Sequence, residues 1–527
     1  MMMDSVQQWL ADLRWMTECE CMSVLQSKSL TVHENNNVQT ANTNGATSLH
    51  AKDQNNKKKQ LIPKSVKEHI DVIRSRAHVV SSEFTKIFSK IEKDRWKHVT
   101  SRMLRIASHL RSLVHECDTA IPFNAPHVIW KQEEQLIENC NCLQNVATEL
   151  MEINSTLPKK TPLLDQLTIT GQIFGCLVDN VLGYLVQTIV DPIVCQSSAV
   201  AVKSSIIHLT DLAIDGEHMC FIVAREGGVR ALLNICHNES IMTSWSHALR
   251  TLATVCCVPE AISELEKENG VELLTDLLND STLNETIRSE AAGVIAQITS
   301  PGLEQYQHLS GFLENIDDLV RSLTVLCVEA STTEVFLLGS AAVANITFMD
   351  SLSCDYLLQY HTARVLIEAS LLNKAESIFS KDQVVTVLTN MAAMESCCHD
   401  ITENNGIELL LHFLQERPHK YEADTEKSAC ERVQQKSAIA LTRLSRLQEN
   451  AQIIIACQGI TRLVQLCRDS YERHNSDAVL VACLAALRKI SASCGTKDFN
   501  PVDVQQLIRP KLLDSFLICS RLEESYV

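Results

Sequence analysis

The sequence predicts an all-α protein, most of it built from stacked helical repeats. A run of small and aliphatic residues at helical spacing recurs six times, for example as HALRTLATV, AAGVIAQIT and SAAVANITF. The last large apolar residue of each copy marks the register: Leu252, Ile298, Ile346, Met391, Leu444 and Ile490. Successive markers are 46, 48, 45, 53 and 46 residues apart. A helical period in the forties is typical of a solenoid, which we place at residues 196–520.

A second phrase precedes several of these copies and contains a glycine before an apolar run. It reads EGGVRALLNIC from Glu226, NGVELLTDLL from Asn269, NGIELLLHFL from Asn405 and QGITRLVQLC from Gln458. Because glycine adopts positive φ without steric cost, we expect it to end one helix. The two-part phrase resembles the armadillo repeat of β-catenin and importin-α. Six copies in register argue against chance similarity in an ordinary helical bundle.

Composition and missing motifs exclude several function classes. A net charge of −17 argues against a nucleic-acid binder and against a general binder of anionic membranes. The 21 cysteines are scattered along apolar helix faces without a C-x-x-C pair, so we read them as reduced core residues and expect no metal site. Phosphate-binding glycine loops, H-E-x-x-H and G-x-S-x-G are absent from the sequence. We therefore expect no cofactor and no enzymatic activity.

The N-terminal segment, residues 1–30, predicts a tethered amphipathic helix. Its apolar stripe follows i, i+3, i+4, i+7 spacing, with acidic residues on the other face. The stripe includes Val6, Trp9, Leu10, Leu13 and Met16. An Asn-rich linker at 31–62 has little to bury, so we expect it to be disordered. Such a helix docks either in a partner's groove or on its own chain, and the sequence leaves both open.

Residues 63–195 predict an irregular helical module that caps the first end of the solenoid. The most apolar long run, Ile173–Val190, contains Asp179, Asn180 and Gln187. These polar residues favour a buried helix over a membrane span, so we expect no integral membrane segment. The N-terminus lacks a basic stretch followed by an apolar one, so we expect no secretory signal and a cytoplasmic protein.

The armadillo resemblance also implies a groove on the inner face of the repeats. In armadillo proteins an asparagine just before the marker position binds the backbone of an extended peptide. Here only Asn345 and Asn390 keep it. The remaining repeats carry Thr251, Gln297, Arg443 and Lys489. We therefore expect a short peptide site over the third and fourth repeats rather than a long cargo groove, and an exposed loop at Arg417–Glu431.

The C-terminal tail, residues 521–527, matches the pattern of a PDZ-domain ligand. The matching residues are Glu524, Ser525, Tyr526 and Val527. A terminal carboxylate docks in a nest of backbone N–H groups, the valine fills an apolar pocket, and the serine bonds across the groove. The alternative is a terminal valine buried in the protein's own fold.

Three stretches together resemble the Inscuteable family of spindle-orientation adaptors. They are VQQWLADLRWMTECECMSVLQ near the start, DAVLVACLAALRKIS in the last repeat, and the ending EESYV. The resemblance implies a non-enzymatic adaptor in asymmetric cell division, located in the cytoplasm and at the apical cell cortex. It implies the tetratricopeptide domain of LGN (Pins in flies) and a Bazooka-type PDZ scaffold of the Par complex as partners. Atypical protein kinase C, Gα and NuMA would be indirect partners, reached through these two proteins.

The same resemblance assigns roles at the N-terminus. Val6, Trp9, Leu10, Leu13 and Met16 would contact the LGN groove, with Glu18 and Glu20 meeting its basic residues. The acidic extended segment expected after the helix is reduced here to Glu34. The alternative function is an armadillo-type nucleotide-exchange factor for Gα subunits. A transport receptor for peptide cargo is disfavoured by the missing asparagines.

Overall fold

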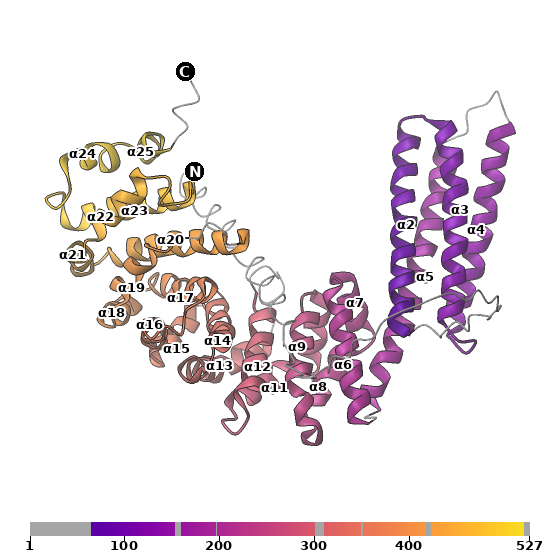
Figure 1. Ribbon diagram of the computed structural model, residues 1–527, viewed down its shortest axis with the longest axis horizontal. Helices are drawn as coiled ribbons and strands as arrows, with labels where there is room; N and C mark the ends of the chain where they lie inside the picture. Colours follow the sequence, from indigo (N-terminus) through magenta and orange to yellow (C-terminus); the bar gives the residue numbers. More distant parts are fainter. Residues whose placement is uncertain are drawn as a thin grey trace, which may run out of the picture. The chain divides into compact units, whose positions relative to one another are not determined.

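The computed structural model describes residues 65–152, 160–195, 198–300, 310–348, 351–417 and 423–520. These residues form helices and connecting turns, without a β-strand among them (Figure 1). They divide into two compact units, one of residues 65–212 with 222–228 and the other of 213–221 with 229–520. The prediction of an all-α chain with an armadillo-like solenoid is confirmed.

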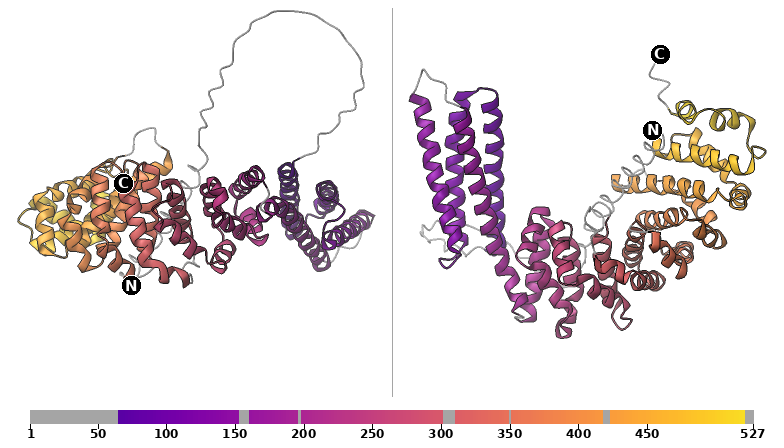
Figure 2. Two further views of the ribbon diagram at one scale, coloured as in Figure 1. Left: turned by 90° about the horizontal axis from the view of Figure 1, so that it is seen from below. Right: turned by 180° about the vertical axis from the view of Figure 1, so that it is seen from behind.

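The first unit is a bundle of long helices. Its members are α2 (Val66–Glu92), α3 (Trp96–Ala120), α4 (His127–Glu152), α5 (Lys160–Val194) and α6 (Ala199–Ile214). The first four pack in chain order, and α5 returns to α2, which closes the bundle (Figures 1 and 2). Ser65 and Glu68 form a capping box that satisfies backbone N–H groups at the start of α2.

Helix α5 forms the apolar core of this bundle. It is the one helix among the described residues that is long and apolar enough to cross a membrane by length and composition. Leu177, Val181 and Leu185 on it are at most 2% exposed. A helix whose apolar side chains are already buried by its neighbours is the core helix of a bundle, as the polar residues within Ile173–Val190 predicted.

The second unit is the solenoid. The division between the two units passes through α7 (Glu217–Arg225) and the start of α8 (Gly228–Cys236), and the short helix η1 (Glu239–Ser244) follows α8. Six helices pack on one another along the inner side of the arc that this unit forms (Figure 1). They are α9 (Trp245–Val255), α12 (Glu285–Ile298), α14 (Thr333–Ile346), α17 (Ile378–Met391), α20 (Asp424–Leu444) and α23 (Asp477–Cys494). Each contains one of the six marker residues, all at most 1% exposed. The apolar repeat in the sequence is thus the inner row of the solenoid.

The remaining helices of this unit form its outer layer and its C-terminal end (Figure 1). The outer helices are α10 (Pro259–Lys267), α11 (Gly270–Asn279), α13 (Ser310–Glu329), α15 (Ser351–Gln359), α16 (Thr362–Leu371), α18 (Glu395–Glu403), α19 (Gly406–Phe413), α21 (Gln448–Ala456) and α22 (Gly459–Arg468). The chain closes with α24 (Pro501–Asp503), η3 (Val504–Ile508) and α25 (Leu512–Cys519).

Of the four recurring glycine positions, Gly227 carries the predicted positive φ, at 78°, and the other three do not. In three repeats the glycine is the first residue of the next helix, and the residue before it is left-handed: Asn269, Asn405 and Gln458, at 54°, 64° and 61°. A Cβ on Gly406 would lie 2.6 Å from the carbonyl oxygen of Ile401. The glycine is therefore needed because two helices approach closely, and an amide side chain tolerates the left-handed turn.

The loop expected at Arg417–Glu431 is shorter than predicted. Helix α20 already begins at Asp424, and Glu426 accepts a hydrogen bond from the backbone N–H of Ala423 at 3.1 Å. Ala429 in this first part of the helix is buried with Leu337 and Phe379. Packing on the preceding repeats extends the helix through a segment whose polar composition suggested a loop.

Candidate functional site: the inner face of the repeats

Two of the three predicted sites lie outside the described residues. These are the N-terminal set Val6, Trp9, Leu10, Leu13, Met16, Glu18 and Glu20, and the tail Glu524, Ser525, Tyr526 and Val527. The linker at 31–62 also lies outside them. The third site, Asn345 and Asn390, is described and falls near the C-terminal ends of α14 and α17.

Both asparagines bind the preceding inner helix. Asn345 donates from Nδ2 to the carbonyl oxygen of Ala296 at 2.7 Å, and Asn390 donates from Nδ2 to Oγ1 of Thr347 at 2.7 Å. Each side chain is half-buried. A side-chain amide has two N–H donors and one acceptor oxygen, so each asparagine spends one donor on the fold and keeps the remainder for a ligand.

The same arrangement continues in the last repeats with different side chains. Arg443 donates from Nη1 to the carbonyl oxygen of Thr389, and Arg446 donates from Nη2 to that of Ala393 at 3.0 Å. Carbonyl groups at a helix C-terminus lack partners within the helix and carry its negative dipole end. Two ladder positions, Asn345 and Arg443, thus cap the previous inner helix, a role that sequence reasoning missed.

Buried ion pairs connect adjacent inner helices. Asp382 on α17 is fully buried and lies 2.8 Å from both Nε of Arg432 and Nζ of Lys436 on α20. Burial would raise the pKa of Asp382, but the two cations outweigh it and hold the pKa below its ordinary value. Arg250 and Glu290 form a similar pair between α9 and α12. These pairs stabilise a specific register of neighbouring helices.

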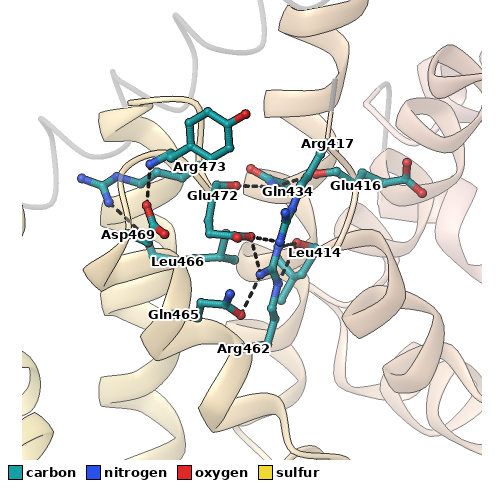
Figure 3. Close-up of polar contacts among 11 residues, drawn as sticks. Leu414, Glu416, Arg417, Gln434, Arg462, Gln465, Leu466, Asp469, Glu472 and Arg473 are labelled. Atoms are coloured by element: carbon teal, nitrogen blue, oxygen red, sulfur yellow. Dashed lines mark hydrogen bonds and ion pairs between the residues drawn. The ribbon is translucent and has the colours of Figure 1, made fainter. Parts of the chain in front are cut away.

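A polar cluster ties together the loops at the ends of the last two repeats (Figure 3). The carboxylate of Glu472 pairs with Arg417 and accepts from Nη1 of Arg462 at 2.8 Å. Gln434 donates from Nε2 to the carbonyl oxygens of Glu416 at 2.8 Å and Glu472 at 3.1 Å. The cluster joins the α19–α20 and α22–α23 connections, so it fixes the spacing of α20 and α23.

The polar groups of this face are held by helix ends and ion pairs. Within the described ranges, no three or more His, Cys, Asp or Glu side chains gather as a metal site. The cysteines in this part of the chain are free, and burial raises the pKa of Cys327 to about 12. A thiol with that pKa is not a nucleophile at neutral pH.

Comparison with known proteins gives the same family from both ends of the chain. The family model "Protein inscuteable C-terminal" matches residues 76–527, and "Inscuteable LGN-binding domain" matches residues 1–41. The Protein inscuteable homologs of Homo sapiens and Mus musculus are each 41% identical over 531 residues, covering 100% of this chain and 88% of the relative.

Solved structures with a similar arrangement include engineered proteins. One is 18% identical with a TM-score of 0.47, covering 81% of this chain and 96% of its own. A designed armadillo repeat protein in complex with the peptide (KR)4 is 19% identical with a TM-score of 0.39, covering 49% and 99%.

Proposed function

Since the chain belongs to the Inscuteable family of spindle-orientation adaptors, we propose that it links the Par polarity complex to LGN through its two ends. It acts as a non-enzymatic adaptor, with the helical repeats as the scaffold between two short binding segments. The observation that carries this proposal is the match of residues 1–41 to an LGN-binding domain.

At the N-terminal end, the apolar stripe enters the groove of the LGN tetratricopeptide domain. Trp9, Leu10 and Leu13 are the central anchors, since buried aromatic and aliphatic side chains carry most of the energy of such contacts. Val6 and Met16 extend the stripe at either side. Glu18 and Glu20 provide charge complementarity at the rim, which affects association rate more than affinity.

The test is fluorescence anisotropy of a labelled peptide of residues 1–41 titrated with the LGN repeat domain. Leu13→Asp places a carboxylate in the apolar groove and abolishes binding. Gln8→Asp adds the same charge on the polar face and leaves binding within a few-fold of wild type. Equal binding by wild type and Leu13→Asp would refute the assignment of the apolar stripe.

At the C-terminal end, Glu524, Ser525, Tyr526 and Val527 bind a PDZ domain of a Bazooka-type scaffold, and through it atypical protein kinase C. Support comes from the tail sequence, in which valine and serine occupy the pocket and bridging positions. Deleting Val527 should abolish capture of the PDZ scaffold by the full chain while LGN capture persists. Loss of both partners would contradict a two-ended adaptor.

The two partners together set where the protein works. A chain held by a polarity scaffold at one end and by LGN at the other belongs in the cytoplasm and at the apical cell cortex, and it reaches Gα and NuMA through LGN. Imaging of a tagged chain during mitosis tests this, because a variant with Val527 deleted should leave the cortex. Cortical localisation that persists in that variant would refute the role of the tail.

A further inference from the structure

The inner face of the last two repeats carries an uncompensated positive charge. Arg443 and Arg446 lie on and just after the end of α20, and Lys489 occupies the equivalent ladder position on α23. Among the described residues, no carboxylate lies within 4.0 Å of these three side chains. We call these three residues the basic strip.

Several other cations of the inner helices are neutralised. Arg432 and Lys436 share the carboxylate of Asp382, and Arg250 pairs with Glu290. On α20 the last ion pair, that of Lys436, lies about two turns before Arg443. The surplus of charge is therefore local to the C-terminal end of the inner row.

Arg443 is held close to another cation without a counter-ion. Burial and the neighbouring Arg446 both lower the pKa of Arg443. Its hydrogen bond uses only Nη1, which donates to the carbonyl oxygen of Thr389, so Nε and the second Nη remain for an anion. Lys489 is half-buried, and no protein partner of its ammonium group is found in the described part of the chain. An anionic ligand would relieve the repulsion and use these donors.

We propose that the basic strip is a docking surface for an extended acidic peptide segment of a partner protein. Carboxylates of the peptide pair with Arg443 and Lys489, whose helices are adjacent in the inner row. Asn390, one repeat earlier, keeps one N–H donor and its acceptor oxygen for the peptide backbone. The surface is separate from residues 1–41, so this inference stands independently of the proposed LGN contact.

The charge of the whole chain selects among anionic partners. At a net charge of −17 the protein repels a long polyanion. A nucleic acid would be attracted to three side chains and repelled by the remaining surface. The same net charge opposes binding to a flat anionic membrane. A short acidic peptide can neutralise the strip without extending over the rest of the acidic chain.

The experiment titrates the full chain into a labelled peptide of alternating Glu and Ser, about ten residues long, at low ionic strength. Charge-assisted hydrogen bonds are the stronger class, so Lys489→Gln and Arg443→Gln should each weaken binding roughly ten-fold. Lys497→Gln, an exposed lysine in the loop after α23, makes the same charge change and should leave binding unaltered. The same peptide with Gln in place of Glu should not bind.

Lys489→Gln keeps the proposal testable if Arg443→Gln disturbs the fold, because Lys489 makes no bond within the described chain. Capture of the LGN repeat domain by Lys489→Gln should equal wild type, which separates this surface from the N-terminal contact. Binding of the acidic peptide that is equal in wild type and Lys489→Gln would overturn the proposal. Displacement of the peptide by inorganic phosphate at equal concentration, or tighter binding of a single-stranded oligonucleotide, would overturn it as well.

Discussion

Replacing Asp382 by asparagine tests the buried ion pairs of the inner row. The substitution keeps the size of the side chain and an acceptor oxygen, but it removes the charge that faces Arg432 and Lys436. Breaking a buried pair by removing one partner costs about 3–5 kcal/mol. We expect the lower end, about 3 kcal/mol, because Lys436 is also bonded to Thr386 at 2.7 Å. At a chain length of 527 residues that is a loss of roughly 3 °C in Tm.

The effect has a defined pH dependence. The pKa of Asp382 in the fold lies below its ordinary value of 3.8, so the pair contributes its full stability above that pH. The contribution is lost as the pH falls through the folded pKa. The difference between wild type and Asp382→Asn should therefore stay constant from about pH 5 to 8 and shrink only in acid.

Thermal unfolding by circular dichroism gives the Tm, and hydrogen exchange locates the loss, because a solenoid need not unfold in one step. Exchange should rise in α17 and α20 and stay unaltered in α2–α5. The matched control is Asp318→Asn, whose ion pair with Arg321 is about half exposed and should contribute less than about 1 kcal/mol. Equal Tm losses in the two variants would refute the argument that burial gives the Asp382 pair its strength.

Three further predictions concern single sites. Burial and the neighbouring Asp118 raise the pKa of Glu133 to about 8. The unfolded chain therefore loses the Glu133 proton at a lower pH than the fold does, and the stability of the fold falls as the pH rises from 4.5 through 8. Glu133→Gln should raise stability by about 2–3 kcal/mol at pH 7 in denaturant titrations, with no gain at pH 4. Gly406→Ala puts a Cβ 2.6 Å from the carbonyl oxygen of Ile401 and should lower the free energy of unfolding by about 1–3 kcal/mol in the same assay. The control Gly175→Ala should give a small gain in stability, because its Cβ meets nothing within 4 Å. Gln435 is fully buried with neither amide atom bonded to protein, so Gln435→Met should raise the Tm; a lower Tm would contradict this.

The repeat itself could be read from the sequence because burial of an apolar stripe is a local property. Leu252 and Ile490 lie in different repeats, but each is buried by neighbours at the same helical spacing. The pairing of Asp382 with Arg432 had no such signal, since the two residues are 50 positions apart in the chain and a charge has no period. The role of Gly406 was mistaken because close approach and positive φ both select glycine.

Comparison of equivalent positions shows that the inner helices are held together unevenly. With the markers aligned, Gln435 of α20 corresponds to Asp382 of α17, while α23 carries Ala478 and Ala482 where α20 carries its two cations. The α20–α23 contact therefore lacks the ion pair of the α17–α20 contact, and the loop cluster around Glu472 joins these helices instead (Figure 3). In a nearest-neighbour solenoid each interface has its own stability. The basic strip spans this same interface, so an acidic ligand bound across it would stabilise a contact that has no ion pair between its helices.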